Sequence, residues 1–468
     1  MITRRASTVI RTLAAISVAI APSTIAAQAT PGSMRERLAK MIRDTTLANG
    51  LTVIVSENHA AAVATVNVIV RTGAFTQEPG DEGISHIFEH VLFRAYGPEQ
   101  AWGSDVAQIN AYSNGGTSSE LVTYYVTTPS QHGERATKIL SDLVMDPKFR
   151  GGDLEDEVRI VMNEYERNAS DPTHRLDVAA SKLLWGAAAA RKDPLGEPAT
   201  IRSFTPKRLK EVHRRYYVPG NAAVIVTGDV AATTAIGWVA KHFGRWKSGP
   251  DPFISNPLPP IPPLTAPAIT VVPADVNQVT VQLQWQGPSA RVAPEDTWSA
   301  DVFSDMVNSA PSGFSQNLRN SNLFQSVGLN YYTQANVGEI TISGITATDR
   351  AAEAFAALRK EIERFDEPDY LSAHLLDLAK KKRRVQSEFG LERGSGLAHS
   401  LGFWWSVAGL DYFRGYHDAM MAVTLEDLRR FVTKYIHRPD VVAVLVPSAW
   451  EAEARAALER TFKAGLIQ

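Results

Sequence analysis

The sequence predicts an α+β protein built from two similar halves. Alternating β-branched runs at residues 52–56 and 63–70 are typical of strands, whereas residues 133–145, 153–167 and 351–365 have the apolar spacing of helices. A proline-rich stretch also divides the chain near its middle. Strands of this alternating kind, followed by helices that cover one face, favour α+β layers over a doubly wound parallel sheet.

The dividing stretch occupies residues 247–273, where Gly-Pro, Asp-Pro and Asn-Pro pairs precede the run Pro-Pro-Ile-Pro-Pro. Proline cannot continue a helix or a central strand, so we expect a semi-rigid extended linker here. The linker separates an amino-terminal domain at residues 30–246 from a carboxy-terminal domain at residues 274–468.

The two halves share motifs in the same order. Thr205 opens a helical pattern that leads to an apolar strand-like run, and Thr424 does the same 219 residues later. Upstream, the Thr-Val pair at Thr65 is matched by the Thr-Val pair at Thr280, at a separation of 215 residues. Two colinear matches at nearly one separation indicate a duplicated domain.

The first 29 residues have the pattern of a signal peptide. Three arginines precede the apolar stretch at residues 12–21, and residues 27–29 read Ala-Gln-Ala, a small-x-small cleavage site. The apolar stretch is too short to span a bilayer. We therefore expect cleavage after Ala29 and a periplasmic or secreted protein.

Composition narrows the class of ligand. With 48 Lys and Arg against 50 Asp and Glu, the chain has no basic excess of the kind that binds nucleic acid or anionic lipid. It contains no cysteine, which excludes disulfides, thiol nucleophiles and thiolate metal sites. Any metal must be held by His, Asp and Glu, which suits zinc or harder divalent ions.

Residues 86–90 read His-Ile-Phe-Glu-His and carry the strongest chemical signal. On a helix, His86 and His90 lie four residues apart on one face, so both imidazoles can reach one metal ion. Glu89 lies beside them and has the length and charge to accept a proton from metal-bound water. The alternative is two surface histidines with a solvated glutamate.

A catalytic zinc usually has three protein ligands, so a third must come from elsewhere in the chain. Residues 155–164 form an acidic helical segment in which Glu157 and Glu164 lie two turns apart on one face. Spacing alone allows either to be the ligand and the other to support the site. An exposed charged helix face is the simpler alternative for this segment.

Residues 83–94, followed about 75 residues later by a Glu-x6-Glu pair, resemble the inverted zinc-binding motif of one metallopeptidase family. This is the M16 family of pitrilysin, insulysin and mitochondrial processing peptidase. Residues 114–118, followed by Tyr124, are similar to the family's edge strand, which takes an extended substrate. The resemblance implies that His86, His90 and Glu164 are zinc ligands, that Glu89 is the general base and that Glu157 is a supporting carboxylate.

The resemblance also implies a fold. We expect two duplicated α/β-sandwich domains of the LuxS/MPP-like metallohydrolase type, facing each other like a clamshell, with metal in the first domain only. Asp301, Ser304 and Asp305 stand in the second half where the two histidines and the glutamate of the motif would fall. The second copy is therefore expected to be metal-free.

Substrate binding is expected from both domains. A peptide or unfolded segment would add as a strand beside Asn114, Gly115 and Thr117. The family also brings an Arg and a Tyr, seven residues apart, from the second domain. Arg319 matches the Arg, but the Tyr is replaced by Gln325 or Ser326, and the nearby Tyr331 is displaced along the chain.

These patterns predict an exported zinc metalloendopeptidase. Because the Arg/Tyr half of the site departs from the family, a related partner subunit is expected to supply it, in a homo- or heterodimer. The alternative functions are a structural or assembly subunit that retains the fold without turnover and a peptide-binding subunit that uses only the edge strand.

Overall fold

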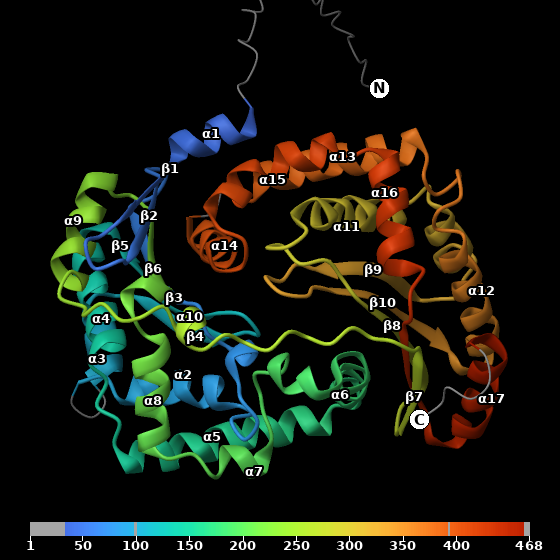
Figure 1. Ribbon diagram of the computed structural model, residues 1–468, viewed down its shortest axis with the longest axis horizontal. Helices are drawn as coiled ribbons and strands as arrows, with labels where there is room; N and C mark the ends of the chain where they lie inside the picture. Colours follow the sequence, from blue (N-terminus) through green and yellow to red (C-terminus); the bar gives the residue numbers. More distant parts are fainter. Residues whose placement is uncertain (1–32, 98–100, 392–393, 463–468) are drawn as a thin grey trace, which may run out of the picture.

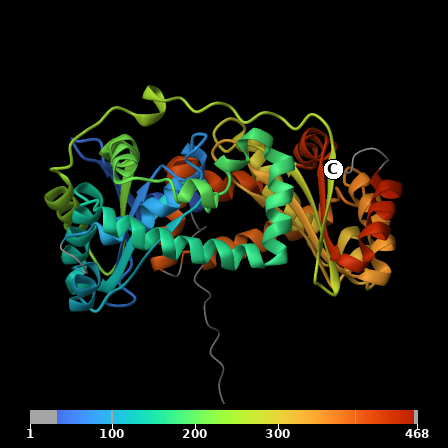
Figure 2. The same ribbon diagram turned by 90° about the horizontal axis from the view of Figure 1, so that it is seen from below.

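The computed structural model describes residues 33–97, 101–391 and 394–462, and it places two mixed sheets with their helices in two lobes. Figure 1 shows the lobes side by side, joined by a long linker that also crosses between them in Figure 2. The expected signal peptide lies outside the described residues. No described helix combines the length and apolarity that crossing a membrane requires.

The first sheet has six strands in the order β1-β2-β6-β3-β5-β4. Only β2 and β6 run parallel; the other neighbours are antiparallel. The strands are β1 Ile42–Thr46, β2 Thr52–Glu57, β3 Val63–Val70, β4 Tyr112–Thr117, β5 Val122–Pro129 and β6 Ala222–Gly228. Strand β4 therefore forms one edge of this sheet.

The second sheet repeats this arrangement with five strands, in the order β7-β11-β8-β10-β9. Its single parallel pair, β7 with β11, corresponds to β2 with β6. The strands are β7 Ala268–Ala274, β8 Gln278–Gln286, β9 Ser326–Tyr332, β10 Glu339–Ala347 and β11 Val441–Pro447. Thr65 and Thr280, matched in the sequence, lie in the corresponding strands β3 and β8, so the α+β duplication is confirmed.

The linker is shorter and less uniform than expected. Residues 252–255 form one helical turn, α10 Pro252–Ser255, whose first amides are capped by Asp251. Strand β7 takes up residues 268–273, which were expected to be linker. The run Ala-Ile-Thr-Val-Val pairs with β11, far along the chain, and Pro273 is tolerated because β7 is an edge strand.

Helices surround both sheets. In the first half they are α1 Met34–Met41, α2 Ile84–Arg94, α3 Ala101–Gln108, α4 Gly133–Met145, α5 Gly151–Ser170, α6 Pro172–Trp185, α7 Pro198–Ile201, α8 Pro206–Tyr216 and α9 Ala232–Phe243. In the second half they are α11 Pro294–Val307, α12 Ala351–Glu363, α13 Ala373–Phe389, α14 Gly394–Val407, α15 Leu410–Ala422, α16 Leu425–Phe431 and α17 Glu451–Phe462. The matched threonines, Thr205 and Thr424, cap α8 and α16.

Each sheet is covered on one face by helices of its own half and on the other by a helix of the opposite half. Helix α14 of the second half packs on β3 and β6, where Leu401 meets Ile69 and Ile225 in one apolar cluster. Reciprocally, helix α6 of the first half packs on β11, where Leu176 meets Leu445. The two lobes therefore complete each other's cores.

Shortening one of these crossing side chains should destabilise the whole molecule. Leu401 is fully buried, so Leu401→Ala is expected to lower the free energy of unfolding by about 2–5 kcal/mol. Val385→Ala, at a position 54% exposed on α13, should change it by less than about 0.5 kcal/mol. Denaturant titration measures both values, and equal effects would mean that α14 contributes little to the core.

Polar contacts also join the lobes beside the end of β4. Gln334 of the second lobe donates to Ser119 Oγ over 2.7 Å, and the Ala335 amide donates to the carboxylate of Glu120 over 2.5 Å. Lys192 donates to the side chain of Gln334. These contacts place the loop before β10 directly against the loop that follows β4.

Candidate metal centre and active site

Helix α2 presents the residues of the His-Ile-Phe-Glu-His motif. Its N-cap, Gly83, has φ +91°, and a Cβ at this position would lie 2.8 Å from the carbonyl oxygen of Leu195. Only glycine fits both constraints. Glycine thus lets the chain turn into α2 immediately before His86.

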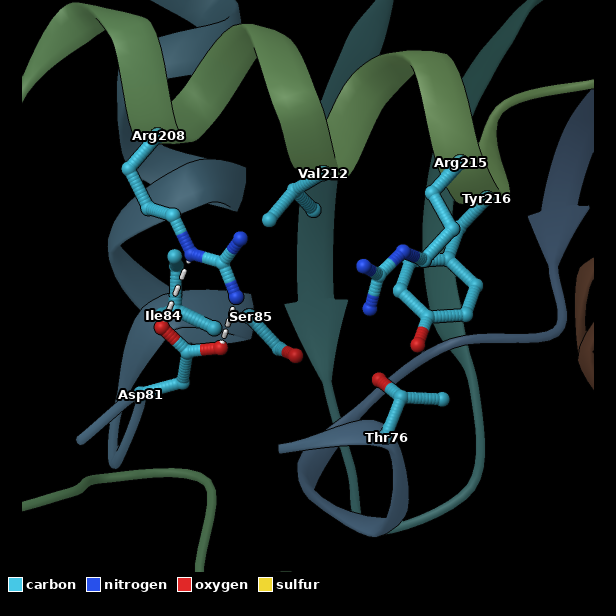
Figure 3. Close-up of a pocket in the computed structure, with 8 residues that line it drawn as sticks. All are labelled: Thr76, Asp81, Ile84, Ser85, Arg208, Val212, Arg215 and Tyr216. Carbon is cyan, nitrogen blue, oxygen red and sulfur yellow. Dashed lines mark hydrogen bonds and ion pairs between the residues drawn. The ribbon is translucent and has the colours of Figure 1, made fainter. Parts of the chain in front are cut away.

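An ion pair holds the start of α2 against α8. Arg208 donates from Nε to Asp81 Oδ1 over 2.9 Å and pairs through a second nitrogen with the other carboxylate oxygen (Figure 3). Thr76, Ser85 and Tyr216 line the same small cavity, which has room for about one water molecule at 10 Å³. This region therefore anchors the motif helix and is too small to bind a substrate.

Helix α5 brings an acidic side chain to the two histidines. Glu164 Oε2 lies 3.6 Å from His86 Nε2 and 3.8 Å from His90 Nε2. One ligand atom from each residue can be chosen so that all three lie within 4.8 Å of one another, and all three residues are partly buried. In the part of the chain that the structure describes, this is the one such group of metal-binding side chains.

Glu157 contacts one imidazole of this group from the side opposite Glu164 along the ring, at Nδ1. It lies two turns before Glu164, is buried, and its Oε2 is 3.0 Å from His90 Nδ1. Its other oxygen accepts a hydrogen bond from Arg94 Nε over 2.7 Å. Burial raises the pKa of Glu157, but the hydrogen bonds from His90 and Arg94 outweigh this effect and lower it. The carboxylate is thus ionised and orients His90 with Nε2 toward Glu164.

Arg94 was not among the residues expected from the sequence. It lies one helical turn after His90 on the same face of α2, so its position beside Glu157 follows from helix periodicity. Arg94 ends the segment 83–94 that resembles the family motif, but no role was expected for it, because an arginine near the end of a helix is common and by itself indicates only a favourable interaction with the helix dipole.

Glu89 is buried between α2 and the edge strand β4. Its Oε2 accepts a hydrogen bond from Thr117 Oγ over 2.9 Å. A Cβ at Gly115 would lie 2.8 Å from Glu89 Oε1, so the absence of a side chain there leaves room for the carboxylate. Burial raises the pKa of Glu89, and the Thr117 hydrogen bond only partly opposes this effect. A carboxylate with a raised pKa is a stronger general base at neutral pH.

The pKa values of the two imidazoles are shifted in opposite directions. Burial, together with the nearby charge of His90, lowers the pKa of His86 to about 4, so that His86 is neutral at pH 7. Burial also lowers the pKa of His90, but the hydrogen bond to Glu157 and the charges of Glu89 and Glu164 raise it overall. A neutral His86 and a His90 made more basic by Glu157 are the states in which imidazoles bind metal well.

The expected substrate strand lies next to this group. Strand β4 pairs with β5 along one side, and among the described residues no strand pairs with its other side. Asn114 and Gly115 lie in β4, and the Asn114 side chain accepts a hydrogen bond from the Gly115 amide. Strand β4 thus offers main-chain groups for an added strand.

The second-lobe residues expected at the substrate do not join this group. Arg319 is exposed and donates from Nη2 to the carbonyl oxygen of Val327 over 2.9 Å. Tyr331 is buried, and its hydroxyl donates to the carbonyl oxygen of Pro288 over 3.0 Å. Tyr332, 44% exposed, is the tyrosine of this strand that reaches the surface.

In the second lobe, the positions that correspond to the motif carry two aspartates and a serine in place of the two histidines and the glutamate. Asp305 on α11 pairs with Arg383 of α13 over 2.6 Å, and the buried Asp301 accepts a hydrogen bond from Tyr416. Ser304 Oγ donates to its own helix. Carboxylates there face a guanidinium, whereas imidazoles face a carboxylate in the first lobe.

Two family profiles match this chain. The sequence profile described as "Insulinase (Peptidase family M16)" matches residues 52–199, and the profile described as "Peptidase M16 inactive domain" matches residues 203–383. The chain is 27% identical over 215 residues to a Bacillus subtilis protein named "Uncharacterized zinc protease YmxG". That match covers 44% of this chain and 51% of the relative, so this chain spans about half of the relative's length.

Solved structures share the fold. A protease from Helicobacter pylori superposes with a TM-score of 0.78 at 21% identity, covering 87% of this chain and 99% of that one. The periplasmic protease PqqL from Escherichia coli superposes with a TM-score of 0.74 at 16% identity, covering 91% of this chain and 50% of that one. Together the two family profiles span both lobes, and the chain belongs to the M16 peptidase family.

Proposed function

We propose that this protein is a zinc-dependent metalloendopeptidase that hydrolyses peptides or unfolded polypeptide segments. The observation that carries the proposal is the convergence of His86, His90 and Glu164, with the buried carboxylate of Glu89 beside them. The metal-binding atoms come from two helices that the fold holds together, which sets them apart from charged residues on a solvated helix face.

The donor set fits zinc. Two imidazole nitrogens and one carboxylate oxygen are typical of catalytic zinc sites, which leave a fourth position for water. When bound, zinc acts as a Lewis acid that makes water more acidic and polarises a carbonyl group. In this chain His86, His90 and Glu164 would hold the ion, and Glu157 would fix the orientation of His90.

Glu89 would act as the general base. Its carboxylate would accept a proton from the attacking water and then deliver it to the leaving amine of the cleaved peptide bond. Thr117 holds one carboxylate oxygen through its hydroxyl, and Gly115 leaves the space in which the other lies. These contacts position the base before a substrate arrives.

The substrate would bind as an added strand along β4. In the segment of β4 that holds Asn114 and Gly115, the main-chain groups directed away from β5 would pair with an extended peptide. Because this pairing uses main-chain groups, it selects extended or unfolded segments more than particular sequences. Thr117 would then link substrate binding to the base, since it lies in the same strand and donates to Glu89.

A related subunit is proposed to complete the substrate site, in a homo- or heterodimer. The support is that Arg319 and Tyr331, which were expected at the substrate, make their hydrogen bonds within the second lobe. Activity should then depend on protein concentration or on an added partner. Full peptidase activity of the isolated chain as a monomer would contradict the partner proposal and leave the zinc proposal intact.

We also propose a periplasmic or secreted location. The support is the signal-like sequence at residues 1–29 and the fold shared with the periplasmic protease PqqL. Fractionation of cells that express the full-length chain tests this location, together with N-terminal sequencing of the product. A protein recovered with its first residues intact from the cytoplasm would contradict it.

The decisive experiment combines metal analysis with a cleavage assay on an unstructured peptide. We expect about one zinc ion per chain, loss of cleavage with a chelator, and recovery when zinc is added back. A chain that binds zinc but cleaves nothing, alone or with its partner, would favour the structural-subunit or peptide-binding alternative.

Glu157→Gln should weaken metal binding without removing a ligand. The amide keeps the size of the side chain but loses the charge that raises the basicity of His90, so zinc affinity should fall by about 10–100-fold. Competition with a metal indicator measures this change. Asp156→Asn, at an exposed neighbouring position of α5, is the matched control, and an equal loss in both variants would contradict the role of Glu157.

A further inference from the structure

Two arginines where the lobes meet the linker make no ion pair with any described residue. Arg71 follows β3 and Arg291 lies just before α11, and both donate to main-chain carbonyls at the end of α14. Arg71 Nη2 donates to Trp405 O over 3.1 Å, and Arg291 Nη2 donates to Ser406 O over 2.9 Å. Cationic groups that a fold partly buries usually have an anionic partner, so this pair is unusual.

The surroundings of Arg71 do not neutralise its positive charge. Burial and the nearby positive charge of Arg291 lower the pKa of Arg71 to about 10, an effect that Asp251 only partly opposes. The Asp251 carboxylate accepts hydrogen bonds from two amides of α10. Arg71 is nevertheless charged at neutral pH, and an anion bound between the two arginines would stabilise it.

Both arginines line a groove of about 690 Å³ between the linker turn α10, the end of β3 and helices α11, α14 and α15. We call this the linker groove. Its volume lies within the range of sites that enclose drug-sized ligands, and such sites favour domain interfaces. The Nη1 amino groups of Arg71 and Arg291 make no hydrogen bond to described residues, so they remain able to bind a ligand in the groove.

Besides the two arginines and Asp251, the linker groove is lined mainly by apolar and aromatic side chains. Trp298, Trp405 and Tyr412 line it from the second half, and the Arg71 guanidinium lies over the Trp405 ring, 3.9 Å from its centroid. Ile254 of the linker turn also lines it and is 81% exposed. An exposed large apolar side chain beside unpaired guanidinium groups is typical of a binding surface for a ligand that is both apolar and anionic.

We propose that the linker groove binds the carboxyl-terminal end of a short peptide whose last side chain is apolar. The free carboxylate pairs with Arg71 and Arg291, and the apolar side chain packs against the aromatic wall. Asp251 interacts electrostatically with Arg71, and the buried Glu120 does so with Arg291, but neither carboxylate forms an ion pair with these arginines, so their guanidinium groups can still bind one carboxylate. The groove is larger than one amino acid, which favours a peptide end over a small free acid. This site is separate from the metal centre and does not require catalysis.

The test measures, by calorimetry, the binding of the tripeptide acetyl-Ala-Leu-Phe to the full chain. The free acid should bind at least 10-fold more tightly than the C-terminal amide, because only the acid carries the charge. 3-Phenylpropionate should bind more weakly than the tripeptide acid, because it fills less of the groove. Equal binding of the acid and the amide would overturn the proposal, and equal binding of 3-phenylpropionate would overturn the assignment to a peptide.

One surface variant tests the location without threatening the fold. Ile254→Glu places a competing carboxylate at an exposed position of the groove and should weaken binding of the tripeptide acid at least 10-fold. Val385→Glu makes the same change at an exposed position outside the groove and should leave binding unchanged.

A variant at the metal centre separates this proposal from the proposed function. The tripeptide acid should bind equally to the wild type and to His90→Ala. Binding that is lost in His90→Ala but kept in Ile254→Glu would mean that the carboxylate binds the metal, and would overturn the groove proposal. Failure of peptide cleavage would leave the groove measurements unaffected.

Discussion

Glu89→Gln should retain zinc and lose peptide cleavage. Glutamine has the same size as glutamate and can still accept the hydrogen bond from Thr117, so the local packing should survive. It cannot take up a proton, and loss of a general base lowers turnover by about 10²–10⁴-fold. The measurement is kcat/KM on an unstructured peptide, with zinc content determined on the same preparation.

Glu155→Gln is the control for this change, because Glu155 is exposed on α5 and the substitution is chemically identical. It should leave both zinc content and turnover unchanged. Wild-type activity in Glu89→Gln would refute the assignment of the base, even if zinc proved essential. Loss of zinc together with activity would instead mean that Glu89 contributes to holding the ion.

His90→Ala should lose zinc and activity together. The substitution removes one of three ligands and also the partner of Glu157, whose buried charge would then face only Arg94. We expect the zinc content to fall from about one ion per chain to near zero, and cleavage to fall below detection. Glu164→Ala should give the same double loss, because its carboxylate is the one within 4 Å of both histidines.

The control for the ligand variants is His437→Ala, which removes a partly exposed imidazole in the second lobe. It should keep zinc and activity. Unfolding of His90→Ala would be visible by circular dichroism and would be separated from ligand loss by the milder His90→Gln. A folded His90→Ala protein that retained a full equivalent of zinc would mean that other residues bind the ion.

Local periodicity predicted much of the site. Positions four apart on a helix share a face, so the convergence of His86 and His90 could be expected as soon as residues 84–94 were taken as helical. The choice between Glu157 and Glu164 as metal ligand could not be made from periodicity. Both lie on one face of α5, and only the way α5 crosses α2 decides that Glu157 meets His90 Nδ1 while Glu164 meets the Nε2 atoms.

The features that sequence reasoning missed depend on contacts between distant segments. Residues 268–273 were expected to be linker because prolines surround them, yet they form an edge strand by pairing with β11. The hydrogen bonds of Tyr331 and Arg319 likewise depend on neighbours, Pro288 and Val327, which no spacing rule identifies. The duplication itself, by contrast, could be predicted from the repeated motifs, because each motif is a short local segment of the sequence.

The exchange of α6 and α14 makes neither half a self-sufficient folding unit. A fragment ending at residue 246 would expose Ile54, Ile69 and Ile225 to water on an apolar sheet face. We expect such a fragment to aggregate. A complementary fragment would expose Leu445 in the same way. Mixed together, however, the two pieces carry all the surfaces they need to reassemble, and a nick within the linker should therefore leave a single, non-covalently joined particle.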